Sequence, residues 1–367
     1  MRVALDYRPA TVAPSSGIAR QVKALEQALR AREDTELLLV SEAPLEHEQR
    51  QTAFCPAWPS PLDGVQRPGV RLRFERKFLP ATIREQSVDL YIATANMGLP
   101  IGHKPAGTRY VLILHDLFQL TQRNFHRSQL KALAYRLIDA VSIAWSIWVA
   151  DEVWCPSRFS CSEAARLFPW ARPKFRVLNN LVPEFQGAIG PLPAGLPERY
   201  WLAVGTREPR KNMPFFIEQW QRCRQENPQV PELVLVGHAS DLPANLSQLP
   251  GLHWVSGISD EQLQALYQHA DCLWQPSYAE GFGLPVVEAL WQGTPVAVAR
   301  GSALDEVSPP SARRFNARDR ASLRNALIEQ AQDSNRPDPD TLRDWARQFA
   351  EPTYRQRLDT LLTGLFH

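Results

Sequence analysis

Short apolar runs alternate with amphipathic, helix-like segments along the chain, and this alternation limits the possible folds more than any other feature. The runs are continuous rather than alternating, which is typical of strands buried on both faces of a parallel sheet. In the first half they lie at 3–6, 37–40, 90–93, 110–114, 153–155 and 175–178. Between the first two runs, apolar residues from Ile18 to Leu29 recur at helical spacing. The pattern predicts a doubly wound α/β domain.

A stretch rich in glycine and proline separates this series from a second one. Beyond it, strand-like runs lie at 201–204, 233–236, 253–255, 272–274 and 295–298, with helices expected at 214–224, 260–270, 285–292 and 321–332. The sequence therefore predicts Rossmann-like domains at 1–186 and 201–345, a linker at 187–200, and a helix at 346–367 that packs back toward the first domain. A cleft between the two domains is the expected ligand site.

Composition excludes several classes of protein. The 367 residues are 44% hydrophobic and carry a formal net charge of +2, which argues against a disordered chain and a general nucleic-acid binder. The five cysteines are scattered without a Cys-x-x-Cys pair, so neither a disulfide framework nor a zinc site is expected. Charged residues interrupt the first apolar stretch, so no secretory signal is predicted.

The first segment with chemical character is 205–212, Gly-Thr-Arg-Glu-Pro-Arg-Lys-Asn. It follows a strand and precedes a helix, so it belongs at the carboxyl ends of the parallel strands. Arg207, Arg210 and Lys211 gather positive charge beside a helix amino terminus, which suits an anion such as phosphate. The alternative is a solvated loop in which arginine pairs with Glu208.

The second such segment is 277–288, Ser-Tyr-Ala-Glu-Gly-Phe-Gly-Leu-Pro-Val-Val-Glu. Gly281 and Gly283 let backbone amides approach a ligand closely, and a helix begins directly after them. Glu280 and Glu288 are expected to face the same crevice, where carboxylates accept hydrogen bonds from sugar hydroxyls. Cations, amides and carboxylates in one place suggest a sugar nucleotide, whereas the alternative is that both glutamates merely cap and solubilise the helix.

These two segments together resemble the retaining glycosyltransferases of family 4, which have the GT-B fold of two Rossmann-like domains facing a central cleft. The resemblance covers about residues 200–300 and is carried by Val-Gly-Thr-x-Glu-Pro-Arg-Lys-Asn and Glu-Gly-Phe-Gly-Leu-Pro-x-x-Glu-Ala. In the first domain, residues 16–20 resemble the glycine-rich loop of the family, with Ala19 in place of a second glycine. His115 and Asp116 resemble its His-Asp pair.

The resemblance implies a role for each matching residue. Arg210 and Lys211 are expected to hold the donor diphosphate, Glu280 the transferred sugar and Glu288 the ribose, with His115 beside the reacting carbon. The expected catalytic residues are Arg210, Lys211, Glu280 and His115. The other expected donor-binding residues are Gly17, Gly205, Gly257, Ile258, Gly281, Phe282, Gly283 and Leu284. The first domain is expected to bind the acceptor and the second the nucleotide sugar.

No cofactor and no metal are expected, because helix amides and cations can neutralise a diphosphate. Asp338-Pro-Asp340 has the spacing of a metal-binding pair but is interpreted as a helix cap. The sequence lacks the Gly-x-Gly-x-x-Gly pattern of dinucleotide sites, which argues against hydride transfer.

The function that the resemblance implies is transfer of a hexose, mannose or rhamnose first, from a nucleoside diphosphate to a glycan with retention. GDP-sugars such as GDP-mannose are the favoured donors and UDP-sugars the next, in the biosynthesis of a surface polysaccharide such as the O-antigen of lipopolysaccharide. Two alternatives stay open. One is a glycan phosphorylase or nucleotide-sugar hydrolase of the same fold, and the other is a non-catalytic subunit that binds sugar nucleotides.

Two basic regions of the first domain are interleaved with apolar residues. One holds Arg71, Arg73, Arg76 and Lys77, and the other holds Arg123, Arg127, Lys131 and Arg136 beside Leu130, Leu133 and Leu137. Cations beside apolar side chains suit anionic lipid headgroups. We therefore expect a cytoplasmic protein that touches the cytoplasmic face of the inner membrane, where it meets a lipid-diphosphate-linked glycan. The alternative is a solvated helix face that packs on its own core.

Overall fold

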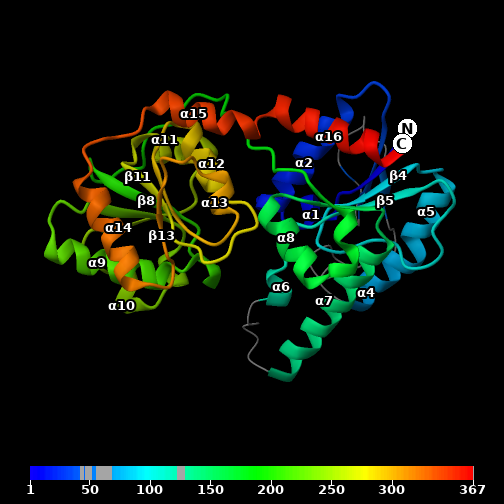
Figure 1. Cartoon of the computed structure of the whole chain (residues 1–367), viewed down its shortest axis with the longest axis horizontal. Helices are drawn as coiled ribbons and strands as arrows, with labels where there is room; N and C mark the ends of the chain where they lie inside the picture. Colours follow the sequence, from blue (N-terminus) through cyan, green and yellow to red (C-terminus); the bar gives the residue numbers. More distant parts are fainter. Residues whose placement is uncertain (42–44, 46–51, 55–67, 122–128, 367) are drawn as a thin grey trace. The chain divides into compact units, whose positions relative to one another are not determined.

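The computed structural model describes residues 1–41, 45, 52–54, 68–121 and 129–366. The chain forms two compact units (Figure 1): Met1–Leu181 with Tyr354–His367, and Val182–Thr353. Each unit contains a parallel sheet with helices on its faces, and each is described separately below.

The first unit contains a seven-stranded sheet in the order β3-β2-β1-β4-β5-β6-β7. Its strands are β1 (Arg2–Asp6), β2 (Glu36–Ser41), β3 (Thr52–Phe54), β4 (Leu90–Ala93), β5 (Arg109–Ile113), β6 (Glu152–Cys155) and β7 (Phe175–Val177). Neighbouring strands are parallel, with Leu5 paired to Leu39 on one side and to Ile92 on the other. The strand order reverses between β1 and β4, which is where doubly wound sheets open a ligand crevice.

Helices connect these strands. They are α1 (Arg8–Val12), α2 (Gly17–Arg30), α4 (Pro68–Arg73), the π-helical turn η1 (Phe74–Phe78), α5 (Leu79–Glu85), α6 (Phe118–Thr121), α7 (Gln129–Val149), α8 (Arg158–Leu167), the 3₁₀ turn η2 (Pro169–Lys174) and α16 (Glu351–Phe366). The apolar stripe read from the sequence as a helix is α2, whose Val22, Leu25 and Leu29 are buried. Ser16 caps it by accepting a hydrogen bond from the Ala19 amide (3.1 Å).

The C-terminal helix α16 packs on the sheet of the first unit. Tyr354, Leu358, Leu362 and Leu365 recur at spacings of three to four residues and are buried in one apolar cluster with strand β1. The stripe forms because residues at helical spacing share one face of a helix. Helix α16 therefore completes the apolar core of the first unit, to which strand β1 also contributes.

The second unit begins at Val182, well before the expected start at residue 201. The Val182 amide donates to the Phe349 carbonyl (3.0 Å), and the Val182 carbonyl accepts from the Trp291 indole (2.8 Å). Val182 is also buried in the core of this unit. Because these contacts hold it to the later helices, the chain enters the second unit directly after Leu181.

The sheet of the second unit has six strands in the order β10-β9-β8-β11-β12-β13. They are β8 (Tyr200–Val204), β9 (Glu232–Val236), β10 (Leu252–Val255), β11 (Cys272–Gln275), β12 (Val296–Ala299) and β13 (Arg313–Phe315). The connecting elements are the 3₁₀ turn η3 (Pro209–Lys211), α9 (Met213–Glu226), η4 (Ala239–Asp241), α10 (Ala244–Ser247), α11 (Asp260–His269), α12 (Leu284–Trp291), α13 (Leu304–Val307), α14 (Arg320–Gln332), α15 (Pro339–Ala346) and η5 (Arg347–Phe349).

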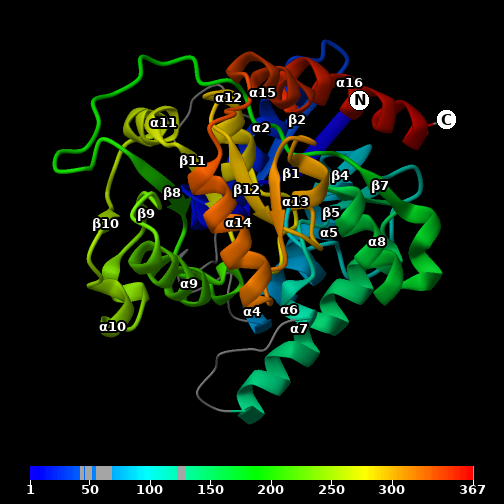
Figure 2. The same cartoon turned by 60° about the vertical axis from the view of Figure 1, so that its left-hand side comes forward.

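Helices cover both faces of this sheet (Figure 2). Helices α9, α10 and α14 enclose one apolar cluster with the sheet, and α11, α12 and α15 enclose another. Trp274 lies in the first cluster, with its ring 4.9 Å from Trp201 and 5.5 Å from Phe216. The doubly wound α/β arrangement predicted for each part of the chain is confirmed.

Candidate functional site

The two predicted loops of the second unit lie side by side. They follow β8 and β11, which pair directly through Trp201 and Cys272, so both loops leave the same edge of the sheet. The Tyr278 amide donates to the Arg210 carbonyl (3.1 Å), which fixes one loop against the other. Asn212 adopts a left-handed conformation (φ 59°) and donates to the Pro276 carbonyl (3.3 Å).

An ion cluster lies where the loops meet. Glu280 is 5% exposed, and its two carboxylate oxygens take different partners. Oε1 accepts from Lys211 Nζ (2.8 Å), and Oε2 pairs with the Arg210 guanidinium. Arg210 also donates to the Glu208 carboxylate (2.6 Å), which is the pairing that the sequence left open as an alternative. Arg210 therefore pairs with both glutamates, and its role toward an anion stays a prediction.

The charge of Glu280 is fixed by these contacts. Burial alone would raise the pKa of its carboxyl, but Lys211 and Arg210, together with hydrogen bonds from Lys211 and Ser277, hold the pKa at about 2. The group is therefore ionised at every physiological pH. A carboxylate with so low a pKa is a poor base, although it can still accept hydrogen bonds.

Helix α12 begins directly after the second loop. Gly283 precedes its first residue and has φ 109°, and a Cβ there would lie 2.6 Å from Leu304 Cδ2, so this position requires glycine. The Phe282 side chain is buried against the Phe349 ring (5.3 Å between centroids). Phe282, Gly283 and Leu284 can therefore offer backbone amides at a helix amino terminus.

The remaining predicted donor residues of this unit lie on the same sheet edge or next to it. Glu288 is buried on α12 and accepts a hydrogen bond from the Tyr267 hydroxyl (2.8 Å). Gly205 directly follows β8 and has φ 84°. Gly257 follows β10 with φ 66°, and a Cβ there would meet no atom of the described residues within 4 Å. Ile258 is half-buried against the core.

In the first unit, His115 follows β5 and is 7% exposed. Its Nε2 lies 2.9 Å from the Thr94 carbonyl, which can only accept, so Nε2 carries the proton and Nδ1 is left as an acceptor. Burial lowers the pKa of His115, which keeps the ring neutral. The Asn96 side chain accepts from the His115 amide (2.8 Å) and fixes the backbone there. Gly17 is the first residue of α2, so its amide lies at a helix amino terminus.

The predicted basic surface divides into two parts. Arg73, Arg76 and Lys77 are exposed, whereas Arg71 turns inward and donates to the Ser142 hydroxyl on α7 (2.6 Å). Arg71 therefore links α4 to α7. It does not belong to the exposed basic surface that the sequence predicts, because it is hydrogen-bonded to a polar residue of α7. Arg123, Arg127 and the side chains of Leu130 and Lys131 lie outside the described residues.

Gln275 and Asn96 contact site residues but were not predicted from the sequence. Gln275 ends β11 and donates to Glu280 Oε1 (2.8 Å), and Asn96 holds the backbone of His115. A polar residue closing a continuous apolar run was the available signal for Gln275. Nothing in the local pattern around Asn96 distinguishes it from an ordinary loop residue.

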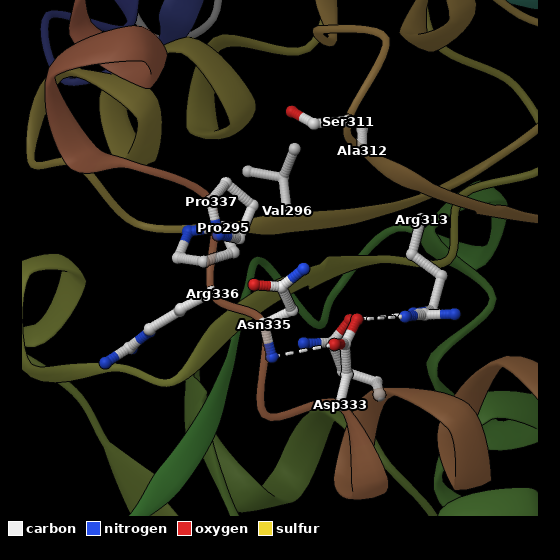
Figure 3. A pocket seen from close by; sticks show the side chains of 10 residues that line it. Pro295, Val296, Ser311, Ala312, Arg313, Asp333, Asn335, Arg336 and Pro337 are labelled. Carbon is white, nitrogen blue, oxygen red and sulfur yellow. Dashed lines mark hydrogen bonds and ion pairs between the residues drawn. The ribbon is translucent and has the colours of Figure 1, made fainter.

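A cavity of about 520 Å³ lies elsewhere in the second unit (Figure 3). It is lined at the amino ends of β12 and β13 by residues that include Val296, Ser311 and Asn335, so it opens at the sheet edge opposite the two loops. Its charged groups are paired, with the Arg313 guanidinium donating to Asp333 (2.8 Å). None of the predicted donor-binding residues lines this cavity.

Comparison with solved structures identifies the class of fold. The chain aligns over its whole length with 99% of a sucrose-phosphate synthase from Thermosynechococcus elongatus, with a TM-score of 0.75 at 20% identity. That protein has the GT-B architecture of two Rossmann-like units, so the predicted fold class is confirmed. That the two units face a common cleft stays a prediction.

Sequence comparison gives a family match within the second unit. Residues 191–331 match the family described as glycosyl transferases group 1. The resemblance to family 4 glycosyltransferases is thereby confirmed.

Two curated relatives are mannosyltransferases. The chain is 29% identical over 217 residues to O-antigen chain mannosyltransferase B of Escherichia coli, covering 54% of this chain and 55% of that protein. It is 32% identical over 146 residues to O-antigen chain mannosyltransferase RfbU of Salmonella typhimurium, covering 37% and 40%. The matches thus span about half or less of these relatives. The match to the family model and both relatives are in line with the hexosyltransferase activity that the sequence predicts.

Proposed function

We propose that this protein transfers a hexose, with mannose favoured, from a nucleoside diphosphate to a glycan with retention at the anomeric carbon. The observation that carries the proposal is the cluster of Arg210, Lys211 and Glu280 at the amino terminus of α12, within a glycosyl transferases group 1 domain. Mannose is favoured because both relatives described above are O-antigen mannosyltransferases, and GDP-mannose is the corresponding donor. UDP-hexoses are the next candidates.

The cluster fits the charge that develops during transfer. The bond between the anomeric carbon and the diphosphate oxygen breaks, and negative charge grows on the diphosphate. Arg210, Lys211 and the α12 amides stabilise that charge. The acceptor oxygen bonds to the same face of the anomeric carbon, and its proton passes to a diphosphate oxygen.

The three buried acceptors have separate roles in this scheme. Glu280 accepts hydrogen bonds from the sugar hydroxyls, and its pKa of about 2 removes it as a general base. His115 offers the Nδ1 lone pair of a neutral ring to the transferred sugar. Glu288 accepts from the ribose hydroxyls, with Tyr267 fixing its carboxylate.

A donor screen with product analysis tests the proposal. Thermal unfolding is measured with GDP-mannose, dTDP-rhamnose and UDP-glucose, because a ligand that binds the folded state raises its midpoint by mass action. Products are then analysed with and without a glycan acceptor. Transfer only in the presence of acceptor supports the proposal. Release of free sugar supports a hydrolase, release of sugar 1-phosphate from the glycan when inorganic phosphate is supplied supports a phosphorylase, and binding without turnover supports a non-catalytic subunit.

We further propose that the acceptor is lipid-linked and that the first unit meets it at the cytoplasmic face of the inner membrane. Helix α7 extends away from the sheet of this unit (Figures 1 and 2), and Leu133, Leu137 and Val141 form an exposed stripe (65%, 63% and 61%). Arg136 lies exposed on the same helix. An apolar stripe beside cations suits shallow insertion among anionic headgroups.

The proposed membrane surface differs from a segment that spans the bilayer. Among the described residues, α7 included, no helix combines the length and apolarity that crossing a bilayer requires. On α4 and η1, Leu72 is exposed, whereas Phe74 belongs to the core, so only part of the predicted apolar surface is available. Contact at the interface is the form of membrane binding that this surface supports.

Flotation with anionic liposomes tests the membrane proposal. We expect binding to phosphatidylglycerol vesicles at low salt and release at high salt, because each cation near the surface contributes about 1 kcal/mol that salt screens. Reversing Arg73, Arg76 and Lys77 to glutamate should abolish flotation and slow transfer to a lipid-linked acceptor. The matched control reverses three exposed arginines elsewhere, namely Arg222, Arg320 and Arg355. Equal flotation of both triple variants contradicts the proposal.

A further inference from the structure

Gln275 is an amide buried at the end of a central strand. It closes β11 and has no exposed surface. Its Nε2 donates to Glu280 Oε1 (2.8 Å) and to the Ser277 hydroxyl (2.9 Å). Its Oε1 has no hydrogen-bond partner in the described part of the chain. Burying an amide whose oxygen accepts no hydrogen bond lowers the stability of the fold. The favourable contribution of Gln275 is therefore its hydrogen bond to Glu280.

The donors to Glu280 are of two kinds. Lys211 and Arg210 are cations, and the proposed function assigns both to the donor diphosphate. Gln275 is neutral. A diphosphate that enters the cluster attracts the two cations strongly, whereas a neutral amide keeps its bond to the carboxylate.

Without Gln275, the exchange would leave Glu280 supported mainly by the neutral Ser277 hydroxyl. The carboxylate is buried, and a buried charge that loses its hydrogen bonds is strongly destabilised. It would take up a proton or turn away, and either change removes an acceptor from the sugar. The Gln275 amide prevents this, since it satisfies Oε1 throughout the exchange.

We propose that Gln275 is a positioning residue that holds Glu280 against the donor sugar while Lys211 and Arg210 move to the diphosphate. This inference rests on the proposed function and extends it to a residue that does not itself touch the donor. It assigns to Gln275 an effect on the sugar part of the donor and none on the nucleoside diphosphate alone.

Gln275→Leu tests this separation. The affinities for GDP and for GDP-mannose are measured by calorimetry, and turnover is measured with an acceptor. We expect affinity for GDP within twofold of wild type, affinity for GDP-mannose at least tenfold weaker, and a fall in kcat. The matched control is Gln219→Leu, which removes another fully buried glutamine of the same unit, whose amide has no hydrogen-bond partner among the described residues. The control should leave both affinities unchanged.

Gln275→Glu keeps the shape of the side chain and adds a pH signature. When protonated, the new carboxyl donates to Glu280 as the amide does. When ionised, it repels Glu280, with Lys211 and Arg210 as the charges that face the pair from the other loop. We expect turnover close to wild type at low pH and a fall as pH rises through the pKa of the pair. A purely structural role would not produce this profile.

Three outcomes separate the two claims. If wild-type protein binds none of the donors, or binds one and transfers nothing, the proposed function and this inference both fail. If wild type transfers but Gln275→Leu behaves like Gln219→Leu, or Gln275→Glu follows the wild-type pH profile, the inference alone is overturned. Loss of sugar-dependent affinity together with low-pH rescue supports it.

Discussion

Each unit of this protein buries a glutamate near two cations, and the two glutamates respond in opposite ways. In the second unit, burial would raise the pKa of Glu280, yet its ion pairs lower the pKa to about 2. In the first unit, burial dominates and raises the pKa of Glu75 to about 7, although Arg8 and Arg71 act in the other direction. The number of nearby cations therefore does not decide the charge.

Hydrogen-bond geometry explains the difference. Arg8 commits its guanidinium to Asp6 (2.9 and 2.7 Å), and Arg71 comes only within 3.8 Å of Glu75 Oε1 while it donates to Ser142. Glu75 Oε1 has no hydrogen-bond partner among the described residues. A buried carboxylate stays charged only where donors point at its oxygens. The cations of the first cluster are thus already bound to Asp6 and Ser142, within the protein.

The second cluster can exchange its partners. Lys211 and Arg210 both point at Glu280, which is itself held by a neutral amide, so an incoming diphosphate can recruit the cations. We therefore expect substitutions in the second cluster to change function as well as stability, and those around Glu75 to change stability alone.

The largest effect should come from Lys211→Ala. Removing a preorganised cation from the developing charge of the leaving group lowers kcat by about 10²–10³. Steady-state turnover with saturating donor measures this, and circular dichroism shows that the variant folds. Lys23→Ala, on the exposed face of α2, is the control. Turnover equal to wild type would remove Lys211 from the site and with it the contrast between the two clusters.

The next effect is on donor affinity. Glu288→Ala leaves the ribose hydroxyls without a buried acceptor, a loss of about 1–3 kcal/mol in binding the nucleoside diphosphate. Calorimetry with GDP measures the change. Tyr267→Phe, which removes the hydroxyl that donates to Glu288 but keeps the carboxylate, should lose much less. If both variants bind GDP like wild type, Glu288 is a structural residue.

A smaller effect is expected on the free energy of unfolding, where variants of Glu75 and Glu280 can be compared directly. The folded-state pKa of Glu75, about 7, lies above the ordinary value of 4.5, so its contribution to stability is complete below pH 4.5 and is lost as pH rises to 7. Glu75→Gln should therefore be more stable than wild type at pH 8, by about 2 kcal/mol since each pKa unit contributes about 1.4 kcal/mol and relaxation reduces it. The two should be equally stable at pH 4.

Glu280→Gln should show the opposite sign. The folded-state pKa of Glu280 lies below its unfolded value, so its contribution is present above pH 4.5 and is lost as pH falls toward 2. The variant should be less stable than wild type at pH 7. Urea unfolding of both variants across pH measures these differences. The same sign of change in both variants at neutral pH would contradict the comparison.

Much of this architecture could be predicted from the sequence, because continuous apolar runs and helical stripes record burial directly. The loops at 205–212 and 277–288 were found for the same reason, since they interrupt that alternation with glycines and charges. Arg71 was predicted on the exposed surface because a run of basic residues does not show which of them meets a polar partner on a distant helix, as Arg71 meets Ser142. Nor does a sequence show which donors point at a carboxylate, so the opposite pKa shifts of Glu75 and Glu280 could not be predicted without coordinates.

The smallest expected effect is that of removing metal ions. If Arg210, Lys211 and the amides at the start of α12 neutralise the diphosphate, turnover needs no divalent cation. We expect dialysis against EDTA to change kcat and KM for the donor by less than about twofold, within the spread of such assays. Lys211→Ala offers the informative control, because Mg²⁺ at millimolar concentration could partly replace the lost charge there and not in wild type. Activity of the wild-type protein that disappears with EDTA and returns with Mn²⁺ would mean that a metal supplies the charge. Lys211 and Arg210 would then stay paired with Glu280, as the cations around Glu75 stay bound to partners within the protein.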